Sequence, residues 1–368
     1  MSSIVAHSVV LAKPFSAFCD AVYHQFQVIN SPAGFICERN QRKSIMTPSV
    51  VQSGALLAGC FALGFGEHIE MRSVSILILT VSIASLAQVS PSPVHNEDIP
   101  SLIASGKVDA AEKIIVSRLM NQPADADLVT FLAEVRLEQG RAEEALRLTG
   151  DAEQIGGPTA LRSQIAGLAN GATGHLTAAE KNFRRAVELD PKFVPAHYYL
   201  ARLLYTRNRF DEAIEESKAA IALSPGLVRA YENVGLCYEG RDDSIQAERW
   251  YRQAILKNLD SPDKTEWPML DLATLLIRQN RQDEARPYLE QALALSPTNP
   301  EAHLQMGILL DKGGDLQGSF EELRTAINLN PNLAGALYRI AHVCKRLGRE
   351  REAQHYFDEY REALGREK

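Results

Sequence analysis

The feature that most constrains this chain is a column of small residues that returns every 34 positions along most of its length. Seven of its eight members are alanine and one is serine, and a single step is 38 residues long. Two further columns of small residues keep the same phase, twelve residues upstream and seven residues downstream. A period of this length is typical of an array in which each unit packs only against its neighbours. The first column consists of Ala111, Ala145, Ala179, Ala213, Ala247, Ala285, Ser319 and Ala353.

Each unit is expected to hold two short antiparallel helices, because small residues in register let two helix axes approach closely. A larger side chain at such a crossing would overpack it, typically at a cost of about 1–3 kcal/mol. Four residues after the first column, most units carry a bulky residue on the same helix face, which we expect to fill the space between units. These residues are Ile115, Phe183, Tyr251, Leu289, Leu323 and Phe357.

Proline and short polar residues mark the helix ends. Proline follows the second helix in five units, at a point where it cannot continue that helix. Short polar side chains near the starts of second helices are expected to cap them by accepting backbone N–H groups. The prolines are Pro123, Pro191, Pro225, Pro297 and Pro331, and the predicted caps are Thr177, Asp211, Ser244 and Asp283.

Several departures from the pattern predict local features. The step of 38 residues places four extra residues in the turn 257–268, which should protrude. Pro287 falls inside a second helix and should bend it or remove one hydrogen bond. Gly150 and Asp151 should weaken the second helix of the unit 126–157. Ile99 replaces the small crossing residue in the first unit, which is expected to act as a degenerate cap of the array.

The C-terminal end of the array is a candidate contact surface. No polar capping helix follows Leu364, so Phe357, Tyr360 and Leu364 are expected near an open end. Exposed apolar side chains there would favour self-association or a partner. The alternative is that the many charged residues of 349–368 cover this end.

Three segments resemble the tetratricopeptide repeat family: AEKNFRRAVELDP (179–191), YENVGLCYEG (231–240) and EARPYLEQALALSP (284–297). The resemblance covers 125–364 well and 95–124 poorly. It implies an all-α, right-handed superhelical solenoid of about eight units over 97–368. It also implies a non-catalytic scaffold that binds peptide or helix segments of other proteins in its concave groove.

Carried over from that family, the groove-facing positions of the first helices hold aromatic and aliphatic residues with interspersed charge. Tyr and Trp, with Arg, carry much of the binding energy in protein interfaces. The basic and amide positions of the family's clamp for chaperone C-termini hold Tyr198, Glu232 and Leu236, which argues against a cochaperone. The predicted groove residues are Tyr198, Arg202, Tyr205, Glu232, Leu236, Glu239, Trp267, Leu270, Thr274, Ile277, Arg278, Leu304, Ile308, Asp311, Tyr338, His342 and Lys345.

No motif for catalysis, a cofactor or a metal ion stands out. The chain lacks a phosphate-binding glycine loop, a nucleophile elbow and a paired-cysteine motif. His197 and His303 share one repeat position, and core packing explains them better than a metal site. Cys237 and Cys344 are three units apart, too far for a disulfide. The net charge of −7 disfavours a nucleic-acid partner.

The segment Met71–Ala87 has the features of a secretory signal peptide. Met71-Arg72 provides the positive start, residues 74–84 are apolar, and Ser85-Leu86-Ala87 is a small-x-small cleavage site before Gln88. It is too short and serine-rich for a membrane span, so any membrane contact is expected through this segment alone. We therefore expect residues 1–70 to reflect a misassigned start, and 88–96 to form a linker. A lipoprotein box at residues 57–60 is a weaker alternative.

Three functional hypotheses follow from these patterns. The first is an exported scaffold, periplasmic or secreted, that binds envelope proteins. The second is an accessory component of a polysaccharide, glycosyltransferase or secretion system. The third is a cytoplasmic regulator, which would hold if the signal peptide is not used.

Overall fold

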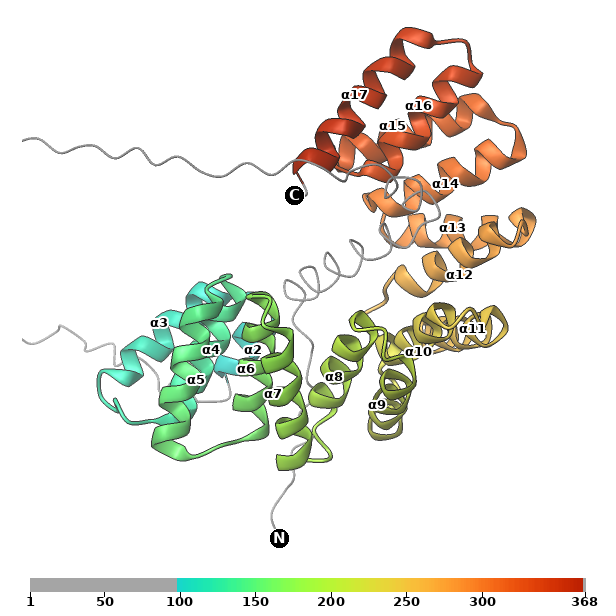
Figure 1. Cartoon of the computed structure of the whole chain (residues 1–368). Coiled ribbons are helices and arrows are strands. Elements are labelled where there is room, and N and C mark those ends of the chain that lie inside the picture. Colours follow the sequence, from blue (N-terminus) through green and yellow to red (C-terminus); the bar gives the residue numbers. More distant parts are fainter. Residues whose placement is uncertain (1–97, 367–368) are drawn as a thin grey trace, which may run out of the picture. The chain divides into compact units, whose positions relative to one another are not determined.

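The computed structural model describes residues 98–366, and every regular element within that range is an α-helix (Figure 1). The predictions for the signal peptide, the linker and residues 1–70 lie outside the described residues. The helices are α2 (Asp98–Ala104), α3 (Val108–Leu119), α4 (Ala126–Glu138), α5 (Ala142–Gly156), α6 (Ala160–Ala172), α7 (Leu176–Leu189), α8 (Val194–Thr206), α9 (Phe210–Leu223), α10 (Val228–Gly240), α11 (Ser244–Leu259), α12 (Trp267–Arg278), α13 (Gln282–Leu295), α14 (Pro300–Gly313), α15 (Leu316–Leu329), α16 (Ala334–Arg346) and α17 (Glu350–Arg366).

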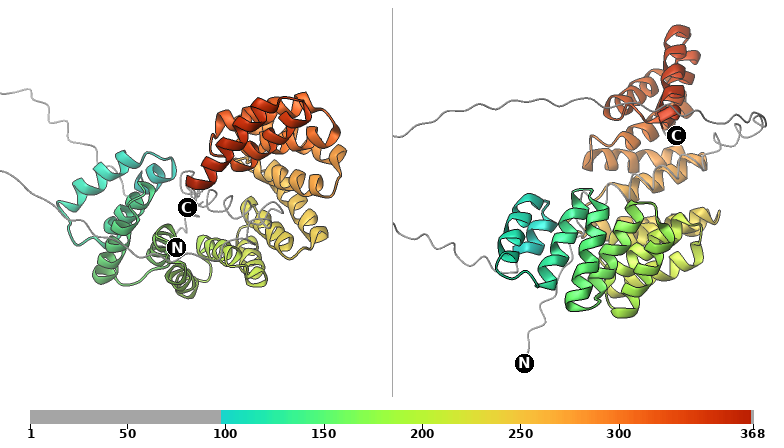
Figure 2. Two further views of the ribbon diagram at one scale, coloured as in Figure 1. Left: turned by 45° about the horizontal axis from the view of Figure 1, so that its top comes forward. Right: turned by 60° about the vertical axis from the view of Figure 1, so that its left-hand side comes forward.

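The sixteen helices of the described range form eight consecutive pairs, which follow one another in chain order (Figure 2). Each helix packs against the next helix in the chain, and the first helix of a unit also contacts the first helix of the following unit. This second contact is weakest between α10 and α12, which flank the step of 38 residues. The prediction of an all-α solenoid of stacked helix pairs is therefore confirmed.

The small residues lie where the two helices of a unit cross. All eight members of the first column are fully buried. At the upstream column, a Cβ built on Gly167 would lie 2.5 Å from the ring of Phe183, and one on Gly235 would lie 2.5 Å from the ring of Tyr251. Small and bulky residues thus complement each other within a unit, whereas the bulky side chains were expected to fill the space between units.

The turn inside every unit contains one residue with positive φ. Five are glycine, and the other three are asparagine or aspartate, which tolerate this conformation better than other residues do. The chain then reverses through a six-to-one hydrogen bond, such as that from the Arg209 amide to the Leu204 carbonyl at 2.9 Å. The sequence analysis missed this column, which consists of Gly106, Gly140, Gly174, Asn208, Asp242, Asn280, Gly314 and Gly348.

The predicted caps of the second helices are wrong, because these helices begin directly after that turn. Thr177, Asp211 and Asp283 lie in the second helical position and Ser244 in the first. The actual N-cap residues are His175, Arg209, Asp243 and Arg281, and of these four only Asp243 accepts a bond with its side chain, from the Gln246 amide at 3.1 Å.

Two predicted weak points leave their helices continuous. Helix α5 runs through Gly150 and Asp151 without a break, so the expected weakening does not interrupt it. Helix α13 continues through Pro287, which lies exposed within it. Proline lacks an N–H, so one backbone hydrogen bond is absent at that turn.

The long turn after α11 is held closed at its base. The side chain of buried Asn258 donates to the Thr265 carbonyl at 2.6 Å and accepts from the Thr265 amide at 3.0 Å. The tip of the turn, at Pro262 and Asp263, is exposed. The insertion therefore lengthens α11 and adds an anchored surface loop. At the start of the array, α2 is short and its Ile99 is fully buried.

Buried His197 and half-buried His303 each tie the start of a first helix to its surroundings. His197 Nδ1 lies 2.7 Å from a Glu216 carboxylate oxygen, and Nε2 lies 3.0 Å from the Pro191 carbonyl. His303 repeats both contacts with Glu322 and Pro297, at 2.7 and 3.0 Å. Both ring nitrogens face acceptors, so the protonated ring satisfies both. The bond to the carboxylate raises the pKa of each histidine.

Tyr231 occupies the same position one unit after His197, and its hydroxyl donates to the Pro225 carbonyl at 3.0 Å. Tyrosine thus makes the same contact with the preceding turn through its hydroxyl group. Hydrogen bonds to the preceding turn are thus the contact that the residues at this position share.

We predict that Gly235→Val destabilises the array, because the new side chain would collide with the fully buried ring of Tyr251. The expected loss is about 1–3 kcal/mol. The control is Gly150→Ala, where a Cβ meets nothing within 4 Å and helix propensity should add about 1 kcal/mol. Urea unfolding followed by circular dichroism measures both. Equal shifts of the two midpoints would contradict the crossing model.

We predict that His197 and His303 make stability fall as pH rises. Their folded-state pKa values exceed the unfolded value of about 6.5, so their stabilisation is complete below that pH. It is lost as pH rises through the raised folded pKa. The double variant His197→Tyr/His303→Tyr keeps the bond to proline and should lose this slope. Thermal unfolding between mildly acidic and mildly basic pH tests the pair, and an unchanged slope would refute the assignment.

Candidate functional site

The predicted groove residues come from five consecutive first helices, α8, α10, α12, α14 and α16. Relative to the small residue at the crossing, they recur three positions before it, one after it and four after it. These offsets lie one helical turn apart, so on each helix they share a face. Two residues depart from these offsets: Trp267 is the first residue of α12, and Arg278 is its last, five positions after Ala273.

The structure divides these residues into three groups by exposure. Five are buried, with Tyr198 only 2% exposed, and they are Tyr198, Leu236, Leu270, Ile277 and Leu304. Nine are half-buried, and they are Arg202, Tyr205, Glu232, Glu239, Trp267, Thr274, Ile308, Asp311 and Tyr338. Three are exposed, and they are Arg278, His342 and Lys345. The second and third groups are the ones that a partner could contact without displacing the core.

Charges in this set pair across neighbouring first helices. Arg278 of α12 forms an ion pair with Glu239 of α10 at 2.6 Å. Asp311 of α14 forms an ion pair with Arg346 of α16. Glu239 also accepts a hydrogen bond from the Tyr251 hydroxyl at 3.0 Å. These pairs link one unit to the next and leave aromatic surface between them.

Two carboxylates at the N-terminal end of the array were missed by the sequence analysis. Glu134 and Glu138 lie one turn apart on α4, and Glu134 holds the position that Arg202 holds on α8. Burial, assisted by the charge of Glu138, raises the pKa of Glu134 to about 7. Burial also raises the pKa of Glu138. Projection of the repeat positions back to α4 would have found Glu134, while Glu138 lies five residues after Ala133, at the offset of Arg278.

The C-terminal end of the array carries a cluster of rings. Tyr338 and His342 on α16 lie 4.4 Å apart, centre to centre, and His342 lies 5.3 Å from Phe357 on α17. Tyr360 lies 5.5 Å from Tyr338, and Lys345 Nζ lies 5.0 Å from the Phe357 ring centre. Phe357 and Tyr360 are therefore half-buried against α16, while Leu364 remains exposed.

The surroundings of the His342 ring favour its neutral form. Burial lowers its pKa, and the positive charges of Lys345 and Arg339 lower it further. A neutral imidazole at this end can donate one hydrogen bond and accept another.

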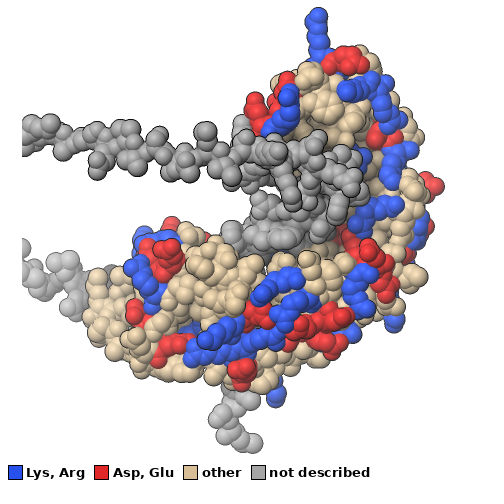
Figure 3. All heavy atoms as spheres, viewed as in Figure 1, with Lys and Arg blue, Asp and Glu red and all other residues tan. Residues whose placement is uncertain are grey.

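One rim of the array carries clusters of arginine around a glutamate. Arg207 and Arg209 both bond to Glu180, at 2.5 and 2.6 Å. Arg281 bonds to Glu248 at 2.7 Å and holds the pKa of that carboxyl below its usual range. Figure 3 shows cationic and anionic side chains interspersed on the visible face. Mixed charge of this kind offers no uniform field for a nucleic acid.

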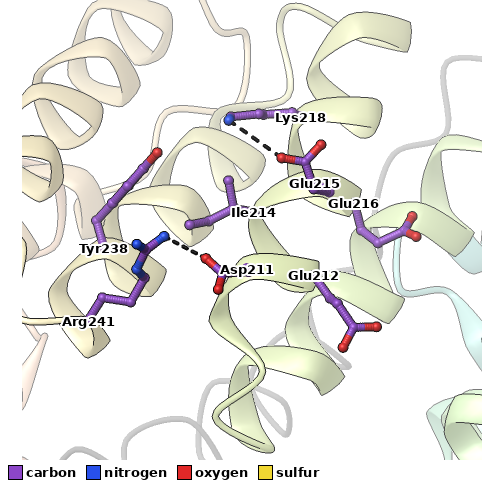
Figure 4. Close-up of a pocket in the computed structure, with 8 residues that line it drawn as sticks. All are labelled: Asp211, Glu212, Ile214, Glu215, Glu216, Lys218, Tyr238 and Arg241. Carbon is purple, nitrogen blue, oxygen red and sulfur yellow. Dashed lines mark hydrogen bonds and ion pairs between the residues drawn. The ribbon is translucent and has the colours of Figure 1, made fainter.

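A shallow pocket of about 300 Å³ lies at α9, with Tyr238 of α10 and Arg241 just after that helix at its edge (Figure 4). Its charged residues largely satisfy one another, since Arg241 bonds to Asp211 at 2.6 Å and Lys218 lies 3.8 Å from Glu215. This arrangement holds no nucleophile next to a base. Within residues 98–366, no group of three or more His, Cys, Asp or Glu side chains could hold a metal ion, and no helix could span a membrane.

Comparison with known proteins finds tetratricopeptide repeat models over four parts of the chain. They match residues 128–150, 166–228 together with 270–334, 227–298, and 334–360. The matched segments cover more than half of the chain and coincide with the helix pairs from α4 to α17.

Individual relatives share only part of their length with this chain. The CTR9 homologue of Arabidopsis thaliana is 24% identical over 277 residues, covering 64% of this chain and 25% of that protein. Type IV pilus assembly protein PilF of Pseudomonas aeruginosa is 27% identical over 145 residues, covering 38% of this chain and 54% of that protein. Cellulose synthase operon protein C of Xanthomonas axonopodis is 27% identical over 267 residues, covering 60% of this chain and 18% of that protein.

Solved structures share the fold at low identity. The Cut9 and Hcn1 hetero-tetramer structure of the APC/C aligns with a TM-score of 0.57 at 16% identity, over 72% of this chain and 52% of that chain. The yeast Tom70 structure aligns with a TM-score of 0.53 at 16% identity, over 70% of this chain and 55% of that chain. Together with the repeat models and the stacked helix pairs, these comparisons show that the chain belongs to the tetratricopeptide repeat family.

Proposed function

We propose that this array is a non-catalytic scaffold that binds peptide or helix segments of other proteins along its first helices, after export to the bacterial envelope. Tetratricopeptide repeats generally mediate protein–protein interaction, and the family models that match are all of this kind. The observation that carries the proposal is the row of accessible aromatic and charged residues on successive first helices. Half-buried Trp267 and Tyr338 are its main aromatic members.

The geometry favours an extended or helical segment as the ligand. Neighbouring packed helices lie about 8–10 Å apart, so equivalent positions on successive first helices form a track of regularly spaced contacts. The ion pairs of Arg278 and Asp311 already satisfy much of the charge along that track. Binding energy would then come mainly from burying aromatic side chains, which lose little conformational entropy when they bind.

Export is supported by the segment Met71–Ala87, whose positive start, apolar stretch and small-x-small end match a signal peptide. A protein processed after Ala87 would keep a short linker before α2. The envelope would then supply its partners. The two cysteines of the array, Cys237 and Cys344, are buried and form no disulfide with each other.

A second candidate is an accessory role in a polysaccharide or secretion system. The match to cellulose synthase operon protein C and to a type IV pilus assembly protein favours it. In this role the array would still bind protein segments along its first helices, but its partners would be components of the polysaccharide or secretion system. A cytoplasmic regulator is the third candidate and requires that the signal peptide remain unused.

We predict that photo-crosslinking residues placed at Arg278 and Lys345 capture a protein partner in the envelope fraction. Both side chains are exposed on first helices. The matched controls are Arg147 and Lys181, which are exposed on second helices. Tyr198 is unsuitable for this purpose because it is buried and its replacement would open the core. Trp267→Ala should weaken capture at Arg278. Equal capture from first and second helices would overturn the groove assignment.

We predict that C-terminally tagged protein recovered from fractionated bacterial cells has an intact mass that begins at Gln88 and appears in the envelope or medium. Replacing residues 76–79 of the apolar stretch with charged residues should retain the protein in the cytoplasm with its N-terminal segment intact. A cytoplasmic product with residues before Met71 would instead support the cytoplasmic regulator.

A further inference from the structure

Helix α11 carries an apolar stripe on its outer surface that the packing of the array leaves uncovered. Ile245 is 79% exposed, and Leu256 and Leu259 are each 61% exposed. With Arg249 and Arg252 they recur at intervals of three or four residues. At 3.6 residues per turn, all five side chains fall within an arc of about 80°. The stripe therefore runs along one face of the helix from its first turn to its last.

The other second helices lack such a stripe. The position of Ile245 is polar or charged in every other unit, where it holds Asp109, Glu143, Thr177, Asp211, Asp283, Gln317 and Arg351. The fold thus does not require an apolar side chain at this position. Three large exposed aliphatic residues on one helix are instead typical of a contact surface.

The insertion unique to this unit extends the stripe. Leu259 is the last residue of α11 and precedes the loop that Asn258 anchors through its two hydrogen bonds with Thr265. The anchored loop therefore fixes the last helical turn and holds Leu259 in line with Leu256. A protruding loop without this anchor would leave that turn free to fray.

The centre of the stripe is cationic. Arg249 is exposed and forms no ion pair within residues 98–366. Arg252 lies one turn further on, and its partner, Glu248, belongs to the same helix at 2.5 Å. Arg281 of α13 also binds Glu248, at 2.7 Å, so that carboxylate is shared between two cations. The stripe thus presents apolar ends around a positive centre.

We propose that this face of α11 docks an amphipathic helix of a partner protein, with apolar side chains at its two ends and Asp or Glu at its centre. The stripe spans about 21 Å between Ile245 and Leu259, which matches a partner helix of about four turns. Carboxylates at the centre of that helix would pair with Arg249 and Arg252. The aliphatic ends would bury Ile245, Leu256 and Leu259.

Two other occupants fit the stripe less well. A second copy of the chain, related by a twofold axis through this face, would place arginines opposite arginines, and like charges at an interface are costly. An amphipathic helix on a lipid surface keeps its cations on the polar face and its apolar residues together. Here the two arginines interrupt the apolar stripe, which disfavours insertion into a membrane.

The test uses two labelled synthetic peptides of about 20 residues, stapled to remain helical. Both carry leucines at the two ends, one has a central pair of glutamates and the other a central pair of lysines. Fluorescence anisotropy with the full chain should detect binding of the glutamate peptide. Arg249→Glu, alone and with Arg252→Glu, should weaken that binding at least about tenfold and favour the lysine peptide.

Control variants separate this surface from the groove. Arg147→Glu changes the equivalent outer position of α5 and should leave binding unaltered, as should Trp267→Ala. Ile245→Ser/Leu256→Ser should weaken binding of both peptides, with circular dichroism showing that the array stays folded. Equal affinity for the two peptides would overturn the proposal, as would no binding of the glutamate peptide at about 1 mM.

Sedimentation experiments distinguish a partner helix from the two other occupants, a second copy of the chain and a lipid surface. Analytical ultracentrifugation should give the same mass for the parent and for Arg249→Glu, whereas a dimer lost in the serine variant would show that the face binds a second copy. Co-sedimentation with vesicles of phosphatidylserine and phosphatidylcholine should be equal for the parent and the serine variant. A loss of vesicle binding in that variant would show a lipid surface instead.

Discussion

The structure depends on the close approach of two helices inside each unit. Gly167 and Gly235 on first helices leave room for the rings of Phe183 and Tyr251 from the second helices of their units. Dense packing of this kind gives many dispersion contacts for little surface. Because most units supply both the small and the large residue, a similar crossing can recur along the chain. The turn with positive φ returns the chain at the required point each time.

Much of this fold could be predicted from the sequence, because the columns of small residues indicate where the two helices of each unit cross. The helix starts could not be placed in the same way. Asp211 and Ser244 have side chains that suit an N-cap, but the preceding turn closes one or two residues earlier than those side chains suggest. The backbone conformation at Asn208 and Asp242 decided the boundary, and a search for Gly, Asn and Asp at the repeat spacing would have revealed it.

Exposure along the candidate groove was harder to predict, because it depends on neighbours and not on repeat position. Tyr198 and Tyr338 hold the same position on their helices, yet Tyr198 is buried and Tyr338 is only half-buried. In the described part of the chain, no first helix follows α16, so rings from α17 cover Tyr338 instead. A tyrosine at the same repeat position is therefore accessible to a partner at the end of the array and inaccessible in its middle.

The glutamates at the rim return at every second unit. Glu112, Glu180 and Glu248 are each 68 residues apart, and each binds arginines from the following unit. Added salt weakens such partly exposed ion pairs, while the apolar crossings do not respond in that way. Other boundaries between units carry ion pairs as well, such as Arg185 with Glu153 and Arg241 with Asp211. Rising ionic strength would therefore weaken contacts between units and spare the apolar crossings inside them. The stiffness of the solenoid against bending therefore depends on the ionic strength of the medium around it.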